Sequence, residues 1–236
     1  MGLRKLLKII NNFVDFCFGL RIQPSAEKRL KNMRDLLIKE YQCDMVIDVG
    51  ANSGEWATKL RKSGFLGDII SYEPSPKFHE LAKKARGESR WKIHNIALSD
   101  YAGASHFFIA SNNGLSSSIL RPKKILDQNF EIEFDATIEV PTNRLDCEVF
   151  EGDSLYLKID VQGAEYNVLQ GAFNLLPKIS VIEFESSLLE LYDGEKNHYV
   201  ISRWLNQHGF FARQIVVTHW DKNLATVSID AIFSRL

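Results

Sequence analysis

One stretch decides the fold, Val46-Ile47-Asp48-Val49-Gly50-Ala51-Asn52-Ser53-Gly54-Glu55. An apolar run ends in a turn of small residues, and the turn leads into a segment with helical periodicity over Glu55–Lys62. A glycine at position 50 allows a tight turn and the close approach of a ligand to the backbone. Ligands of open α/β sheets bind at the carboxyl ends of such strands. The stretch therefore predicts a strand–turn–helix unit with a ligand at its turn.

The same turn limits the kind of ligand. Asn52 stands where the dinucleotide fingerprint GxGxxG has its second glycine, and Asp48 puts an acid at the strand end. A carboxylate there repels a phosphate and favours a cationic group, such as a sulfonium or an amine. The turn therefore argues against nicotinamide dinucleotides.

The pattern alternates between strands and helices from residue 44 onward. We expect strands at 45–49, 68–72, 91–94, 105–110, 155–159, 179–184, 211–217 and 226–233, and helices at 55–62, 77–85, 164–175 and 197–208. This order predicts a parallel sheet with helices on both faces. The last two strands have no full helix between them, which predicts a hairpin with one antiparallel strand.

Residues 1–40 differ from the rest of the chain. They carry nine Lys or Arg residues and four acidic residues, and apolar residues recur at helical spacing between Leu3 and Cys17. A helix there packs on the domain or on a second subunit, or contacts an anionic membrane surface through residues 1–20. A second helix is expected to start after Pro24-Ser25 and to run to about Tyr41. We divide the chain into an N-terminal helical extension, 1–40, and one domain, 41–236.

Composition excludes several classes of protein. The 236 residues carry a net charge of -1, which argues against a nucleic-acid binder. Three cysteines without a CxxC pair exclude a zinc ribbon and are typical of reduced thiols in a cytoplasmic protein. No run of 18 apolar residues is present, and no cleavage site follows the apolar segment near the N-terminus.

A polar loop at 111–118 interrupts the alternation, and periodicity stays weak as far as Asp135. Irregular insertions of this length in a compact domain are usually functional or mobile.

Polar residues follow the next strands at the same expected edge of the sheet. Glu73, 19 residues after Gly54, is suited to accept hydrogen bonds from a ribose diol, and Pro74 ends its strand. Lys158 and Asp160 share one side of their strand, as do Glu183 and Glu185 on the strand that follows. Glu165 begins a helix, where a carboxylate also balances the helix dipole. Carboxylates alone specify no metal, and no His/Cys spacing indicates one.

These segments together resemble the FkbM family of methyltransferases, which use S-adenosylmethionine (SAM). The resemblance covers about residues 44–210. It rests on 48–54, 72–74, 97–100, 145–146, 158–165, 168–172 and 182–183, which occur in order. Gln162 is a departure, because the family often has Glu at this position.

The resemblance implies a class I methyltransferase fold, a Rossmann-like sandwich whose seven-stranded, mostly parallel sheet has its last strand antiparallel. It implies methyl transfer from SAM to a hydroxyl oxygen, usually of a sugar in a glycan or glycoconjugate and sometimes of a polyketide-type product. The residues expected at SAM are Asp48, Gly50, Ala51, Asn52, Gly54, Glu73, Pro74, Asn95, Ala97, Leu98 and Asp160.

The acceptor hydroxyl is a weak nucleophile, so a base should remove its proton. Asp160 is the first candidate, followed by Glu183 or Glu165, and Lys158 orients Asp160 or binds the acceptor. The residues expected at the acceptor are Ser116, Ser117 and Arg121. No metal is expected.

Two other classes stay open. One is a nicotinamide-dependent reductase, against which Asn52 counts. The other is a non-catalytic SAM-binding or scaffold protein attached to a membrane through residues 1–20. Because the expected N-terminal helix has an apolar face, we also expect a homodimer.

Overall fold

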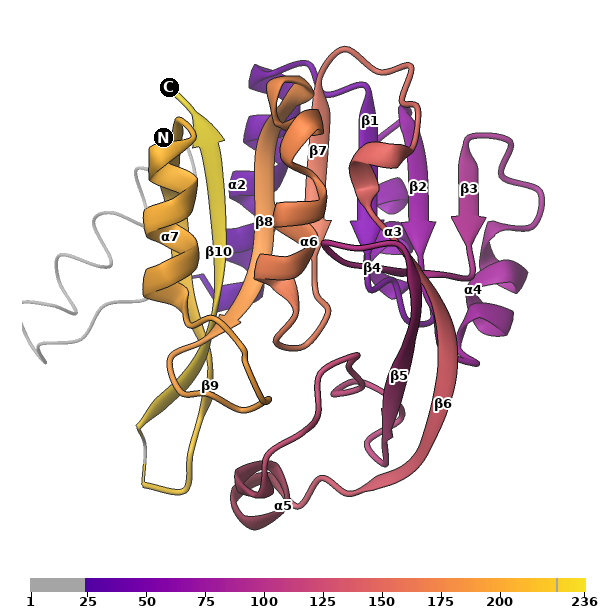
Figure 1. The fold of residues 1–236 in the computed structure, drawn as a ribbon. Coiled ribbons are helices and arrows are strands. Elements are labelled where there is room, and N and C mark those ends of the chain that lie inside the picture. The colour runs from indigo at the N-terminus through magenta and orange to yellow at the C-terminus, as the bar shows by residue number, and fades with distance from the viewer. Residues whose placement is uncertain (1–23, 224) are drawn as a thin grey trace, which may run out of the picture.

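The computed structural model describes residues 24–223 and 225–236, without the side chains of 127–129. The predictions made for residues 1–20 lie outside this part. A seven-stranded sheet carries helices on both faces, and a three-stranded sheet adjoins it (Figure 1). The elements in chain order are α2 (Ala26–Glu40), β1 (Met45–Val49), α3 (Glu55–Lys62), β2 (Asp68–Tyr72), α4 (Phe78–Ala85), β3 (Trp91–His94), β4 (Ala97–Leu98), β5 (Gly103–Ala110), α5 (Lys124–Phe130), β6 (Phe134–Asn143), η1 (Leu145–Cys147), β7 (Leu155–Ile159), α6 (Glu165–Gly171), η2 (Phe173–Lys178), β8 (Ile179–Ser187), α7 (His198–Gln207), β9 (Phe210–Trp220) and β10 (Thr226–Arg235).

The large sheet has the order β3-β2-β1-β7-β8-β10-β9. β1 runs parallel to β2 and β7, and β7 runs parallel to β8. β10 is antiparallel to both β8 and β9, so the last strand enters the sheet by a hairpin. The predicted seven-stranded sheet with its last strand antiparallel is therefore confirmed.

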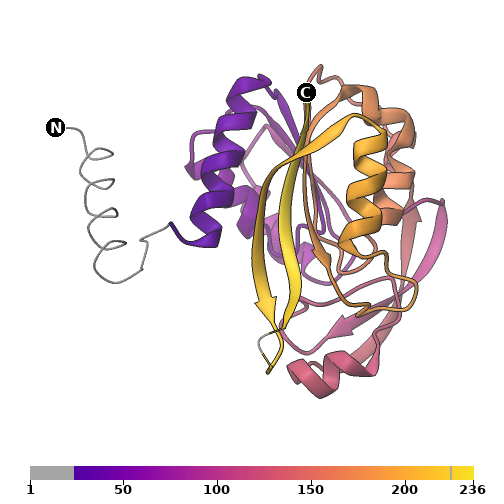
Figure 2. The ribbon, with the colours of Figure 1, turned by 90° about the vertical axis from the view of Figure 1, so that its left-hand side faces the viewer.

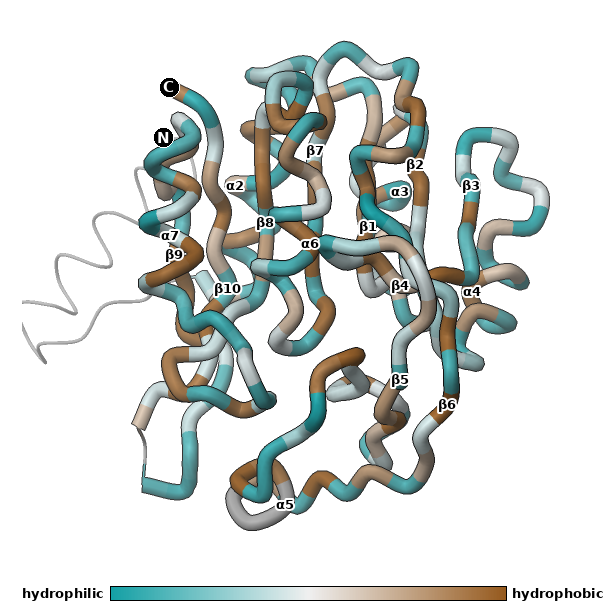
Figure 3. Tube along the Cα trace, viewed as in Figure 1, coloured by the Kyte–Doolittle hydropathy of each residue, from teal (hydrophilic) through white to brown (hydrophobic). Residues whose placement is uncertain are grey.

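The sheet separates two hydrophobic cores. β1, β7 and β8 are buried on both faces, which is typical of parallel strands covered by helices. One core joins the sheet to α6 and α7, and the other joins it to α2, α3 and α4. Figure 2 shows α2 and α7 on opposite sides of the strands, and Figure 3 shows hydrophobic residues along β8 and β10.

α2 belongs to the second core. Its buried residues Leu30 and Leu37 join a cluster that contains Val216 of β9 and Ile232 of β10. Ser25 caps the helix through its hydroxyl, which accepts a hydrogen bond from the Lys28 amide. The helix expected to start after Pro24-Ser25 and to run to about Tyr41 is present as α2. None of the helices in the described part of the chain combines the length and the apolar composition that a membrane span needs.

Two sequence expectations need correction. The helix predicted at 164–175 ends at Gly171, and 3-10 geometry continues over Phe173–Lys178, which contains Pro177. A side chain at position 171 would meet the carbonyl of Ser99 at 1.9 Å, so this glycine lets α6 lie against the segment after β4. The irregular insertion also contains α5 and the beginning of β6. The strand signal of β6 was weak because most of its side chains are exposed or half-buried and because it contains Pro141.

The insertion lies at the functional end of the large sheet. β5 and β6 pair antiparallel, and the small sheet with α5 lies beyond the carboxyl ends of β1, β7 and β8 (Figure 1). The polar loop at 111–118 follows β5 and faces those strand ends. The fold therefore brings the insertion and the strand-end motifs to one place.

Candidate active site

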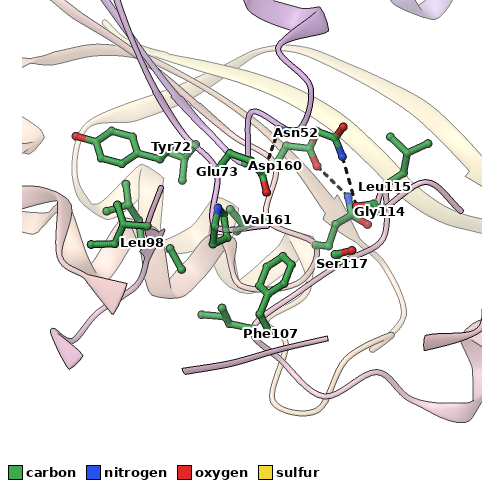
Figure 4. A pocket seen from close by; sticks show the side chains of 17 residues that line it. Asn52, Tyr72, Glu73, Leu98, Phe107, Gly114, Leu115, Ser117, Asp160 and Val161 are labelled. Atoms are coloured by element: carbon green, nitrogen blue, oxygen red, sulfur yellow. Dashed lines mark hydrogen bonds between the residues drawn. The ribbon is translucent and has the colours of Figure 1, made fainter. Parts of the chain in front are cut away.

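A pocket opens at the carboxyl ends of β1 and β2, under the insertion (Figure 4). We call it the cofactor pocket. It is lined by Val49, Gly50, Asn52, Tyr72, Glu73, Pro74, Ile96, Ala97, Leu98, Phe107, Gly114, Leu115, Ser117, Ile119, Asp160, Val161 and Gln162. Its floor comes from the strand-end motifs and its roof from the loop at 111–118.

The turn after β1 requires its glycine. Gly50 has a φ of 75°, and a Cβ there would lie 1.8 Å from the carbonyl oxygen of Asp160. The backbone after β1 therefore passes directly against the backbone after β7. Asn52 also adopts a left-handed φ of 46°, which directs its amide N–H to the Glu73 carboxylate at 2.6 Å.

Glu73 is the buried carboxylate of this pocket. One oxygen accepts the Asn52 amide, and the other accepts the Ser75 amide at 2.8 Å. Burial raises the pKa of Glu73, which these two hydrogen bonds partly offset. A carboxylate has about four lone-pair sites, so the two that remain can accept a diol.

The acid of the first motif lies below the pocket. Asp48 is fully buried, its carboxylate lies 3.2 Å from the Lys158 ammonium, and it accepts a hydrogen bond from Ser71. The expectation that Asp48 faces a cationic ligand is therefore corrected, because its positive partner is Lys158. Burial opposes the charge on Lys158, but Asp48 and Asp160 raise its pKa above the ordinary value.

The residues expected at the cofactor divide into two groups. Those that line the pocket are Gly50, Asn52, Glu73, Pro74, Ala97, Leu98 and Asp160. Asp48, Ala51, Gly54 and Asn95 support them from outside it. Asn95, for example, donates to the Glu73 carbonyl at 2.8 Å, and a Cβ on Gly54 would meet Leu81 at 2.8 Å.

A second cavity of about 300 Å³ adjoins the first, and we call it the acceptor pocket. The two share Leu115, Asp160 and Gln162. Its apolar wall includes residues of α5 and the segment that follows it, together with residues near the ends of β8 and β10; they are Leu126, Phe130, Ile132, Leu191, Tyr192 and Val227. Its polar lining includes Glu185, His219 and Ser228.

Asp160 lies where the two pockets meet. Its carboxylate accepts a hydrogen bond from the Gln162 amide at 2.8 Å and lies 3.5 Å from the Lys158 ammonium. Burial raises the pKa of Asp160, Lys158 opposes this shift and Glu185 adds to it. The same Gln162 nitrogen donates to Glu185 at 3.1 Å, so one amide bridges the two carboxylates.

Gln162 holds its bridging position with a left-handed φ of 56°. A strained backbone at a polar residue is typical of functional sites. A glutamate here would place a third carboxylate between Asp160 and Glu185, whereas the amide of Gln162 supplies donors to both. The departure from the family's usual residue thus matches its surroundings in this chain.

The Glu183 carboxylate forms an ion pair with Arg34. Arg34 of α2 donates two hydrogen bonds to its carboxylate, at 2.8 and 2.5 Å, and the Tyr156 hydroxyl donates a third. Burial would raise the pKa of Glu183, but Arg34 brings it below the ordinary value. Glu183 lines neither pocket described so far; it faces a wider cavity of about 530 Å³ beside α2. This geometry argues against its expected role as the base.

Glu165 is likewise engaged by the backbone. Its carboxylate accepts the amides of Val161 and Gly163 at 3.0 Å and is buried. Burial and nearby Glu195 raise its pKa well above the ordinary value. Glu165 borders the acceptor pocket, and its hydrogen bonds fix the loop that carries Asp160.

The residues expected at the acceptor separate in the structure. Ser117 lines the cofactor pocket and Ser116 lines the acceptor pocket. Arg121 lies away from both, with its guanidinium 5.7 Å from the ring centre of Phe108, so this expectation is corrected.

Two polar residues of this region carried little signal in the sequence. His219 and Asp230 stand on β9 and β10, far along the chain from any motif. Asp230 pairs with Glu185 across the strands, and burial together with Glu185 and Asp160 raises the pKa of Asp230 to about 8. Only the antiparallel return of β10 brings it to the site.

Comparison with known proteins gives consistent results. The family model described as "Methyltransferase FkbM domain" matches residues 48–212. A curated relative, 2-O-methyltransferase NoeI of Sinorhizobium fredii (strain NBRC 101917 / NGR234), is 30% identical over 200 residues, which cover 80% of this chain and 82% of NoeI. Among solved structures, an uncharacterized protein from Listeria monocytogenes serotype 4b has a TM-score of 0.51 at 11% identity, covering 91% of this chain and 69% of that one.

Proposed function

The chain belongs to the FkbM methyltransferase family, and we propose that it transfers a methyl group from SAM to a hydroxyl of a sugar in a glycan or glycoconjugate. The observation that carries the proposal is the junction at Asp160. There a pocket with a buried carboxylate for a ribose opens into a separate cavity with polar and apolar walls. Two joined pockets are what a two-substrate transfer reaction requires.

The residues of the cofactor pocket fit SAM. Glu73 has lone pairs free for the ribose hydroxyls, and Ala97 and Leu98 give an apolar wall for the adenine. The close backbone at Gly50 and the side-chain amide of Asn52, both in the pocket lining, suit the methionine part. SAM supplies an electrophilic methyl group carried on a sulfonium.

The roof of this pocket has to move when the cofactor binds. The enclosed volume is about 70 Å³, whereas ligand pockets commonly hold about 300 Å³ or more. Asn52 reaches the roof through its side-chain amide, which lies 3.5 Å from the Gly114 carbonyl (Figure 4). This hydrogen bond is long and therefore weak. The Lys77 ammonium also donates to the Asn113 side chain at 2.5 Å, and the Tyr192 hydroxyl donates to the Ser116 carbonyl at 2.8 Å, so an outward movement of the loop at 111–118 has to break or shift these contacts as well.

The acceptor pocket suits a sugar ring. Its volume of about 300 Å³ accommodates a monosaccharide unit, and ring hydroxyls find partners in Asp160, Gln162 and Ser116. The apolar residues of the lining suit the C–H face of a ring. Alignment of a hydroxyl with the methyl group at about 3–3.5 Å is the main task of such a site.

Asp160 is the residue that we place at the reacting atoms. It lines both pockets, and Lys158 and Gln162 fix its carboxylate. From this position it accepts a hydrogen bond from the acceptor hydroxyl and orients its oxygen. Lys158 is a positioning residue because its ammonium lies between Asp48 and Asp160.

Two measurements test the proposal. SAM or its demethylated product at about 100 times the dissociation constant should stabilise the protein by about 2.7 kcal/mol, a rise in Tm of about 5–10 °C. NAD serves as the control and should leave Tm unchanged. Release of the demethylated product is then followed with a panel of methyl glycosides and a panel of polyketide alcohols. No shift with SAM contradicts the cofactor, and turnover only with polyketide alcohols contradicts the sugar acceptor.

A further inference from the structure

His219 lies at the polar end of the acceptor pocket, next to the side chains of Ser228 and Glu185. Its Nδ1 lies 2.8 Å from the Ser228 hydroxyl and 3.4 Å from the Glu185 carboxylate. The Ser228 hydroxyl donates its own proton to Glu185 at 2.9 Å. Its oxygen is therefore left to accept from Nδ1–H of His219.

This arrangement selects one tautomer of the imidazole. When Nδ1 carries the proton, Nε2 has a free lone pair. Within residues 24–223 and 225–236 no hydrogen bond engages Nε2, and the side chain is 63% exposed. A neutral imidazole with a fixed Nδ1–H and a free Nε2 is the form of histidine that acts as a general base.

Resting on the function proposed above, we propose that His219 is the general base that takes the proton of the acceptor hydroxyl, and that Glu185 is its positioning residue. The acceptor O–H bond breaks as its oxygen bonds to the methyl carbon, and the carbon–sulfur bond breaks with its electrons staying on sulfur. The proton goes to Nε2. A positive charge is thus lost at the sulfonium and gained at the imidazolium.

His219 is better placed than Asp160 for this step. Asp160 lines the cofactor pocket as well, and its carboxylate is already engaged by the Lys158 ammonium and by the Gln162 amide. His219 lines the acceptor pocket and not the cofactor pocket. Asp160 then orients the hydroxyl while His219 removes the proton.

The groups that face His219 favour its protonation. Glu185 on β8, Asp230 on β10 and Asp160 after β7 are all acids, and the hydrogen bond with Glu185 raises the pKa of His219 above its ordinary value. An imidazolium formed at this position is therefore stabilised by the surrounding charge. The base is active when neutral, so kcat/KM should rise with pH through the His219 pKa and then level off.

The first experiment follows the pH dependence of kcat/KM with a methyl glycoside that the wild-type protein methylates. The kcat/KM of His219→Gln should fall about 10²–10⁴-fold, and its pH profile should lose the acid limb. The Kd for SAM should stay unchanged. Glu185→Gln should keep the limb but move it to lower pH by about one unit, because it removes the negative partner. His79→Asn, at an exposed position on α4, should behave as wild type. The base assignment is overturned if His219→Gln keeps wild-type kcat/KM, or if the limb disappears only in Asp160→Asn.

The second experiment needs no acceptor. NMR titration of the His219 ring in the free protein should give a pKa above the ordinary value for histidine, and Glu185→Gln should lower it. An unchanged His219 titration in Glu185→Gln overturns the pairing. Failure of the proposed function is distinguishable, because it appears as a missing rise in Tm with SAM.

Discussion

The two ends of the sheet's carboxyl edge are built differently. At β1 and β2 the polar contacts are mainly backbone amides directed at one buried carboxylate, Glu73. At β8, β9 and β10 they are titratable side chains, with Glu185, His219 and Asp230 beside Asp160. At the first end a ligand meets one carboxylate that backbone amides hold in place, whereas the other end carries several titratable side chains. We therefore expect the first end to set the affinity for the cofactor, and the second end to set the rate and its pH dependence.

The largest expected effect concerns the contact that joins α2 to the acceptor end. Arg34→Met leaves the Glu183 carboxylate buried without its positive partner, which should lower the free energy of unfolding by about 3–5 kcal/mol. Thermal melting with SAM titration separates this loss from cofactor binding, which should persist. The double variant Arg34→Met/Glu183→Gln is the control, and it should recover part of the stability.

The same ion pair predicts a pH dependence. Arg34 holds the pKa of Glu183 below its ordinary value, so its contribution is present above the unfolded-state pKa of about 4.3 and is lost as the pH falls further. The difference in Tm between wild type and Arg34→Met should therefore shrink below that pH. A difference that grows toward acid would contradict the ion pair as the cause.

The next effect tests the cofactor end. Glu73→Gln removes the charge that accepts the Asn52 and Ser75 amides, so the Kd for SAM should rise about 10–100-fold. Once SAM is saturating, kcat should fall less than about threefold, because Glu73 lies away from the reacting atoms. Calorimetry gives Kd, and exposed Glu80→Gln is the matched control. A large loss of kcat at unchanged Kd would contradict the division between the two ends.

The cofactor end was predictable from sequence because its main residues lie in short motifs directly after strands. Gly50, Asn52 and Glu73 follow two neighbouring strands, and the period of each strand places them at one edge. The same reasoning wrongly predicted that Asp48 faces a cationic ligand. A sequence pattern shows that a residue is at a strand end, but it does not show which group pairs with its charge. Lys158 pairs with it across β1 and β7, a contact set by the register.

The acceptor end was predictable only in part. Glu185 follows from Glu183 by the period of a strand, and Asp160 from its motif. His219 and Asp230 depend on the register of the β9–β10 hairpin, which includes shifts at Ser228 and is not encoded by any local motif. Glu183 was placed on the correct face, but its partner Arg34 comes from a helix 149 residues away in the chain.

A smaller effect tests the charge at the acceptor end. The pKa of Asp230 is raised to about 8, so in wild type this group lowers stability as the pH rises from about 4 to 8. Asp230→Asn should remove this loss and raise the free energy of unfolding at pH 8 by about 1–2 kcal/mol, or Tm by about 2–8 °C, with little change near pH 4. Thermal melts between pH 4 and pH 8 measure this gain. The control Asp135→Asn, at an exposed position, should leave Tm unchanged at both pH 4 and pH 8. Equal gains at both pH values would show that packing rather than charge is responsible.

The smallest expected effect tests whether the acceptor end binds a second sugar beyond the acceptor pocket. Trp220 is 52% exposed at the end of β9 and lines the wide cavity beside α2, which meets the acceptor pocket at Asp160 and Glu185. Because it is exposed, Trp220→Ala should change the free energy of unfolding by less than about 0.5 kcal/mol. An aromatic ring there can stack on a second sugar, so KM for an oligosaccharide acceptor should rise about fivefold, near 1 kcal/mol, while KM for a monosaccharide glycoside stays constant. If KM changes equally for both acceptors, Trp220 acts on the sugar that is bound at Asp160 and not on a second sugar beside it. The acceptor end would then bind one sugar only.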